Sequence, residues 1–87
     1  MNNVVFLSNG WTKYQSFVFE NDRRILKKIR ELIADISRNG NTGIGKPEPL
    51  IGDLSGWWSR RITETHRLIY MVDEENIYIA KCRGHYT

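Results

Sequence analysis

The stretch KPEPLIGDLSGWWSRRITETHRLIYMV, residues 46–72, decides the fold because it carries most of the chain's chemistry between two apolar runs. It opens on a carboxylate, Glu48, that stands between Pro47 and Pro49. Proline fixes its own φ and pushes the residue before it away from helical angles, so we expect Glu48 to be extended. A carboxylate held this stiffly belongs either to a structural turn or to a preorganised base.

Beyond the prolines the pattern predicts antiparallel strands. Residues 52–56 (GDLSG) predict a turn. Residues 57–63 and 67–72 then read as two strands, which residues 64–66 join as a hairpin. A last strand is expected over residues 77–83.

The sequence pattern does not determine which face of the sheet each arginine of this hairpin occupies. Side chains alternate strictly between the two faces of a strand. A one-residue change in the hairpin loop therefore moves Arg67 from the side of Arg60 to the side of Arg61, and both placements stay open.

The N-terminal part predicts a strand followed by a helix. The run VVFL, residues 4–7, is apolar and bounded by turn residues, which favours a buried strand. Ser8 or Asn9 then caps a helix that ends near Asn21. Its apolar residues share one helical stripe, which we expect in the core: Trp11, Tyr14, Phe17 and Val18.

A second helix has the clearest period. Asn21 or Asp22 caps it, and Asn39 with Gly40 ends it. Its apolar face consists of Ile25, Ile29, Leu32, Ile33 and Ile36. Its other faces, either a solvated surface or a binding surface, carry the basic residues Arg23, Arg24, Lys27, Lys28 and Arg30.

The order of these elements predicts a small α+β domain in which two N-terminal helices pack on one face of an antiparallel sheet. A chain of 87 residues is expected to form one domain, residues 1–87, around a small core. No apolar run approaches the ~18 residues of a membrane span, and MNNVVFLSNG lacks the features of a signal peptide. We therefore expect a cytoplasmic protein without a membrane partner.

Composition narrows the chemistry. The single cysteine, Cys82, forms no internal disulfide, which agrees with a reducing compartment. The spacing of Cys82, His66 and His85 along the chain matches no recognisable metal-binding motif, so we expect neither a metal nor a cofactor. The net charge of +3 favours a polyanionic or acidic partner but does not separate RNA from an acidic protein.

The polar residues supply the parts of a metal-free RNA cleavage. That reaction needs a base for the 2′-hydroxyl, an acid for the leaving 5′-oxygen and cations for the developing charge. Glu48 is the candidate base, and His85 is the candidate acid because histidine changes charge closest to neutral pH. Arg67 and Lys46 are suited to hold phosphate, and Tyr86 offers a ring or a hydroxyl to the substrate. Taken singly, each of these residue types more often serves structure or solubility.

Three neighbouring ring side chains are predicted to pack rather than to act. We interpret His66 as a structural or supporting residue. We expect Trp57 and Trp58 to pack against the helices rather than to stack on nucleobases.

Three runs, KPEPL, LSGWWSRRITETHRLIY and CRGHY, closely resemble those of the YoeB/Txe-type toxins of the RelE superfamily. A looser match extends through DRRILKKIRELIADISRNG, so the resemblance covers nearly the whole chain. It implies a compact fold like that of small microbial ribonucleases, with two N-terminal helices against an antiparallel sheet. It also implies a toxin of a type II toxin–antitoxin module that cuts mRNA in the decoding site of the 70S ribosome.

The resemblance also assigns roles by motif. The implied catalytic residues are Glu48 as base, Arg67 for transition-state charge, His85 as acid and Tyr86 for orientation of the substrate. Lys46 and Arg61 match basic positions that are expected to contact phosphate. Three residues depart from the family pattern. Ile51 stands where a lysine is common. In the C-terminal tail, Gly84 replaces a bulkier residue and Thr87 is extra, and both changes can loosen the tail.

The resemblance implies a cognate acidic antitoxin of the YefM/Axe kind. We expect this partner to pair carboxylates with Arg60, Arg61 or Arg67 and to cover the Trp57 and Trp58 region. A homodimer stays open.

Two other functions remain as alternatives. A non-catalytic inhibitor on the same fold is one, as in ParE-type toxins that poison DNA gyrase, although that branch lacks the combination of the KPEP glutamate and the terminal His-Tyr found here. The other is a basic RNA-binding or ribosome-binding module that positions phosphates without cutting.

Overall fold

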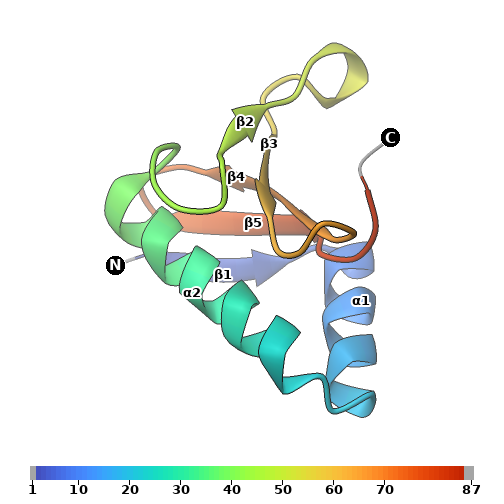
Figure 1. Cartoon of the computed structure of the whole chain (residues 1–87). Coiled ribbons are helices and arrows are strands. Elements are labelled where there is room, and N and C mark those ends of the chain that lie inside the picture. Colours follow the sequence, from blue (N-terminus) through green and yellow to red (C-terminus); the bar gives the residue numbers. More distant parts are fainter. Residues whose placement is uncertain (1, 86–87) are drawn as a thin grey trace.

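A computed structural model describes residues 2–85 of the chain. Two helices and a five-stranded sheet form an α+β fold, as predicted (Figure 1). In chain order the elements are β1 (Asn3–Phe6), α1 (Ser8–Phe19), α2 (Arg23–Asn39), β2 (Glu48–Pro49), the short 3-10 helix η1 (Gly52–Leu54), β3 (Trp58–Arg61), β4 (Arg67–Val72) and β5 (Asn76–Lys81). No helix within the described residues is long and apolar enough to cross a membrane.

The sheet is mixed rather than wholly antiparallel. Its strand order is β1-β5-β4-β3-β2, and the three pairs from β2 to β5 are antiparallel, as the hairpin signals predicted. β1 instead lies parallel to β5 at the edge of the sheet. The chain leaves β1 through two helices rather than a hairpin, so this connection does not impose the reversal of direction that a hairpin does.

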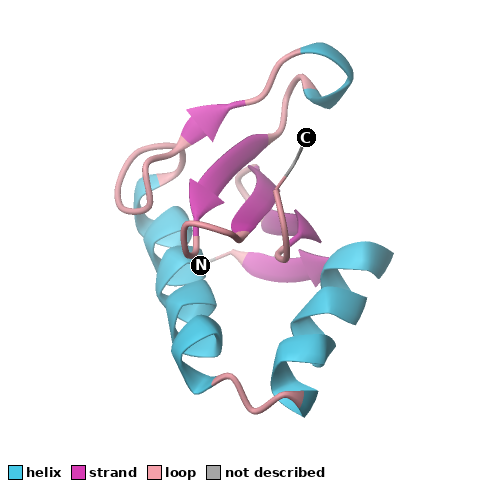
Figure 2. Ribbon diagram, turned by 45° about the vertical axis from the view of Figure 1, so that its right-hand side comes forward, coloured by secondary structure: helices cyan, strands magenta, loops and turns pink. Residues whose placement is uncertain are grey.

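Both helices cover the same face of the sheet, and the core lies between them and the strands (Figure 2). The predicted apolar face of α2 is confirmed, because Ile29, Leu32 and Ile36 are buried there. They meet the buried strand residues Leu68, Tyr70, Ile77 and Ile79. Trp58 is half-buried against this cluster, in agreement with a packing role.

The two helices begin in different ways. Asp22 caps α2 as predicted, since its carboxylate accepts a hydrogen bond from the Ile25 N–H at 3.2 Å. The predicted cap of α1 is wrong: Leu7 occupies the N-cap position, and its side chain makes no capping bond. Ser8 and Asn9 already belong to the helix.

The stripe predicted on α1 enters the core only in part. Phe17 is 1% exposed, but Trp11 is 48% exposed and Val18 is 50% exposed. The helix packs mainly on β5, near the edge of a small sheet, so little protein covers its flanks. Trp11 finds partners at that rim instead, with its ring 5.6 Å from that of Phe6 and 6.2 Å from that of Tyr14.

A buried arginine fastens the loop after α2 to the sheet. Arg60 has 0% exposure, and its guanidinium forms an ion pair with Asp35 of α2. Its Nε donates to the Tyr70 hydroxyl at 3.1 Å. Its terminal nitrogens donate to three loop carbonyls, at 2.7 Å for Gly40, 3.0 Å for Thr42 and 3.0 Å for Ile44. Together these bonds match the five N–H donors of a guanidinium.

Asp35 completes this buried pair. The Arg60 hydrogen bond holds the pKa of the Asp35 carboxyl below its usual range against the opposing effect of burial. Further bonds come from the Ile44 N–H at 3.1 Å and the Asn39 amide at 2.8 Å. Of the three arginines expected to pair with a partner's carboxylates, Arg60 is therefore excluded, because its ion pair closes inside the protein.

We predict that Arg60→Ala lowers the free energy of unfolding by ~3–5 kcal/mol, since it leaves Asp35 as an uncompensated buried charge. The adjacent Arg61 is exposed and serves as the matched control. Arg61→Ala should change the stability by no more than ~0.5 kcal/mol. Denaturant unfolding of both variants measures the difference, and equal stabilities would contradict the role of the buried pair.

Candidate active site

A cleft of about 460 Å³ opens where β2, β3, β4 and the C-terminal tail meet. Its lining residues come from segments that are far apart in the sequence: Lys46, Pro47, Glu48, Ser59, Arg61, Arg67 and His85. Figures 1 and 2 show the tail passing beside the turn that joins β3 to β4. The structure thus places five of the six candidate residues around one hollow. The sixth, Tyr86, lies outside the described residues, as does Thr87.

Strand register explains why these side chains share a face. Ser59 lies opposite Glu48, and Arg61 lies directly opposite Arg67. Because side chains alternate along β3, Ser59 and Arg61 point away from the helices while Arg60, between them, points into the core. The open question is thereby settled: Arg67 lies on the side of Arg61.

The segment that carries Lys46 and Glu48 is fixed by a close approach to α2. Gly45 has φ +78°, and a Cβ there would lie 2.7 Å from Leu32 Cδ2. Its carbonyl accepts the Arg61 N–H at 2.7 Å, next to the cleft. Glycine adopts this positive φ without strain and leaves Leu32 undisturbed, so the chain turns toward the cleft immediately before Lys46.

The hairpin turn holds the guanidinium of Arg67. Its Nη1 donates to the carbonyls of Thr63 at 2.6 Å, Glu64 at 3.0 Å and His66 at 3.2 Å. Arg67 is therefore an oriented cation rather than a freely moving one. Its cross-strand neighbour Arg61 carries the same charge, and like charges directly opposite each other destabilise a sheet. An anion between them would relieve that repulsion.

The tail that brings His85 to the cleft is tied down at Gly84. The Gly84 carbonyl accepts the Arg67 N–H at 3.0 Å, and the Gly84 N–H donates to His66 Nδ1 at 2.9 Å. Gly84 has φ +82°, a conformation that glycine adopts without strain. This glycine therefore occupies a bonded turn, although its small size was expected to loosen the tail.

Sequence reasoning missed two residues of the cleft, Pro47 and Ser59. Ser59 is only 3% exposed and lies two residues before Arg61. The period of a strand therefore provided a signal for Ser59, because residues two apart share a face.

Cys82 offers no competing nucleophile. It is buried, and desolvation raises the pKa of its thiol to about 11, so the thiol stays protonated at neutral pH. Its Sγ–H donates to the Gly10 carbonyl at 3.6 Å. Among residues 2–85, no three His, Cys, Asp or Glu side chains lie together as metal ligands would.

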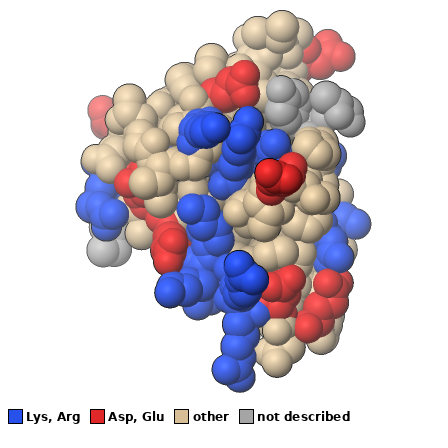
Figure 3. All heavy atoms as spheres, viewed as in Figure 1, with Lys and Arg blue, Asp and Glu red and all other residues tan. Residues whose placement is uncertain are grey.

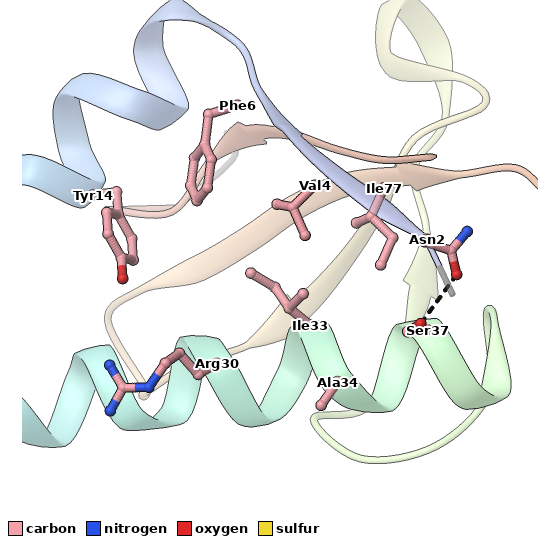
Figure 4. Close-up of a pocket in the computed structure, with 9 residues that line it drawn as sticks. All are labelled: Asn2, Val4, Phe6, Tyr14, Arg30, Ile33, Ala34, Ser37 and Ile77. Carbon is pink, nitrogen blue, oxygen red and sulfur yellow. Dashed lines mark hydrogen bonds between the residues drawn. The ribbon is translucent and has the colours of Figure 1, made fainter. Parts of the chain in front are cut away.

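A second hollow of about 420 Å³ lies between β1 and α2 (Figure 4). Its walls are mainly apolar, with Val4, Ile33 and Ile77 among them. Asn2 and Ser37 form a hydrogen bond of 3.1 Å at one end. No carboxylate or histidine lines this hollow, so acid–base chemistry points to the first cleft.

Basic side chains gather in a band over the face that carries α2 and the strands above it (Figure 3). The exposed basic residues of α2 include Arg23, Arg24 and Lys27. A continuous basic surface of this kind attracts polyanions.

The fold is shared with bacterial toxins of known structure. A YoeB dimer from Staphylococcus aureus is 46% identical to this chain with a TM-score of 0.89, and the match covers 98% of each chain. A chain from the YoeB–YefM complex of Staphylococcus aureus is 45% identical, with a TM-score of 0.89 and 99% of each chain covered.

Sequence similarity then identifies the family. Toxin YoeB of Streptomyces coelicolor is 51% identical over 83 residues, which cover 95% of this chain and 98% of that protein. The pattern of the YoeB-like toxins of bacterial type II toxin–antitoxin systems matches residues 6–86. The chain belongs to this family, and the resemblance read from its motifs is confirmed.

We predict that the cleft binds single-stranded phosphate backbones in a salt-dependent way, because each neutralised phosphate releases counterions. Lys46→Ala or Arg67→Ala should each reduce the slope of log affinity against log salt by about 1. Fluorescence anisotropy with a 2′-deoxy oligonucleotide, which lacks the attacking hydroxyl, measures binding alone. Lys27 lies outside the cleft and pairs with Glu31 at 4.0 Å, so Lys27→Ala is the control and should change the slope less. An affinity that does not vary with salt would rule out phosphate binding.

Proposed function

We propose that this single domain is an endoribonuclease toxin that cuts mRNA on the ribosome by metal-independent acid–base catalysis, and that it acts in the cytoplasm. The observation that carries the proposal is the cleft in which Glu48, Arg67 and His85 meet. They represent the three chemical types that the reaction requires: a carboxylate, a fixed cation and an imidazole. Membership of the YoeB-like toxin family supports the same activity.

In the proposed reaction Glu48 removes the proton of a ribose 2′-hydroxyl, and the resulting oxygen attacks the adjacent phosphorus. The bond from phosphorus to the 5′-oxygen breaks, and His85 gives its proton to that leaving oxygen. The products are a 2′,3′-cyclic phosphate and a 5′-hydroxyl. Tyr86 is proposed to orient the substrate.

Cations stabilise the charge that develops on the phosphate. Arg67 is already oriented by the carbonyls of the hairpin turn, so little reorganisation is needed when the charge appears. Lys46 and Arg61 also line the cleft and are proposed to hold the phosphate chain. The basic band of Figure 3 supports docking on ribosomal RNA.

We further propose that an acidic antitoxin controls this activity. The Staphylococcus aureus YoeB has been solved in complex with YefM, and also as a dimer. On this chain Arg61 and Arg67 line the cleft, so carboxylates of a partner would compete there with RNA phosphate. The same relatives support self-association as a second assembly.

We predict that Glu48→Ala and His85→Ala each slow mRNA cleavage about a hundredfold or more, the usual range for loss of a general base or acid. Both residues are exposed, so the fold should persist, which circular dichroism would check. The measurement is the rate of cleavage in a translation assay with mapping of the mRNA ends. Cleavage at the parental rate by either variant would remove that residue from the mechanism, and an uncleaved mRNA with the intact protein would favour a non-catalytic inhibitor.

We predict that expression of the intact chain alone stops bacterial growth and that co-expression of the adjacent antitoxin frame restores it. The Glu48→Ala variant is the matched control, since it should allow growth and still bind the antitoxin. The free antitoxin segment should be protease-sensitive and become protected in the complex, because it orders on binding. Normal growth with soluble intact protein confirmed in the cells would be incompatible with a toxin.

A further inference from the structure

The tail before His85 is attached to the rest of the molecule at successive residues. Arg83 pairs with Glu20 of α1 through bonds of 2.7 and 3.2 Å, and also donates to Ser16 Oγ at 2.8 Å. Gly84 is bonded on both sides to the hairpin turn, as described above. His85 follows directly, so the bonds of Gly84 help to direct its backbone, and its carbonyl also accepts a bond from Lys81 Nζ at 3.3 Å.

Of these bonds, only the one from Gly84 ends on a side chain that changes charge near neutral pH. The Gly84 N–H donates to His66 Nδ1 at 2.9 Å. A ring nitrogen accepts a hydrogen bond only when it carries no proton, so the proton of a neutral His66 sits on Nε2. Protonation of Nδ1 would place two N–H groups face to face and break this bond.

The ring of His66 has a fixed place. It packs against the ring of Phe17 in α1 in a T-shaped arrangement, with the centroids 5.3 Å apart and the planes at 72°. His66 is half-buried between that helix, the hairpin and the tail. The contact with Phe17 and the bond from Gly84 together fix the orientation of this ring.

We propose that His66 is a positioning residue for His85: as a neutral imidazole it fixes the Gly84 turn and so holds His85 in the cleft, and its protonation releases the tail. The catalytic consequence rests on the proposed function. The anchoring itself does not, because it concerns only bonds within this chain.

The charges around His66 favour the bonded state at neutral pH. Desolvation lowers the pKa of His66, and the positive charges of Arg83 and His85 lower it further. Asp22 and Glu20 act in the opposite direction. A histidine whose pKa in the folded protein lies below its unfolded value of about 6.5 stabilises the folded, bonded state fully when the pH is above the unfolded value. This stabilisation is lost as the pH falls toward the folded pKa of His66, so the hydrogen bond between His66 and Gly84 breaks in acid.

The two histidines are therefore needed in opposite states. His85 must carry a proton to act as the acid, whereas His66 must lack one to hold the tail. A positive charge on His85 lowers the pKa of His66, so protonation of His85 helps to keep His66 neutral. The anchor and the proposed acid are coupled through their charges as well as through the backbone.

Two substitutions of His66 distinguish the effect of its hydrogen-bond acceptor from the effect of its change in protonation. In His66→Asn the amide oxygen lies close to the place of Nδ1 and accepts a hydrogen bond at any pH. In His66→Leu the side chain has similar bulk but no acceptor. NMR of the full-length protein and both variants, followed between neutral and mildly acidic pH, reports the Gly84 amide directly.

In the parent protein the Gly84 amide shift should change with the same midpoint as the His66 ring. In His66→Asn this pH-dependent change should vanish while the amide stays protected from exchange. In His66→Leu the amide should exchange about tenfold faster or more. A Gly84 amide that ignores the titration of His66 and is equally protected in His66→Leu would overturn the proposal, and the parent titration decides this even if a variant fails to fold.

Cleavage on ribosomes adds a second readout. His66→Leu should lower kcat about tenfold with little change in KM, because the acid is misplaced while phosphate binding persists. His66→Asn should restore kcat and lose the acid-side decline that His66 causes. Loss of kcat in both variants with intact amide protection would overturn the positioning role. Amide results as expected in a protein that cuts no RNA would support the anchor and refute the proposed function.

Discussion

The ion pair between Arg60 and Asp35 is the constraint on which the rest of this structure depends. A small core rarely accommodates a guanidinium, and the cost of removing the charge from water is offset here only because the donors all have partners. Those partners belong to α2, β4 and the loop that leads to β2. One side chain thus joins the helical layer to the sheet and directs the chain toward Glu48. Stability and the shape of the cleft rest on the same bonds.

The sequence predicted the elements with strong local signals. The 3.6-residue period and the Asp22 cap located α2, and the prolines around Glu48 indicated an extended segment that the structure shows as β2. The motifs also named residues that the structure brings around one cleft. These features were predictable because each depends on neighbours a few residues away in the chain.

Features set by long-range contacts were not predictable in the same way. Nothing in the pair Arg60 and Arg61 indicates which one is buried, because that depends on hairpin register and on Asp35, 25 residues away. The exposure of Trp11 depends on how far the small sheet extends beneath α1, and the parallel placement of β1 depends on the path of two helices. Periodicity describes a face of an element but not what covers it.

Arg61 and Arg67 lie opposite each other, and the repulsion between their like charges destabilises the free protein. Any ligand that supplies negative charge between them stabilises the folded state by mass action, by about 2.7 kcal/mol at a hundred times its dissociation constant. Inhibition and protection from unfolding would then be one event for an acidic partner seated there. A toxin that outlives its antitoxin would lose inhibition and stabilisation together, so it would become active and less stable against unfolding at the same moment.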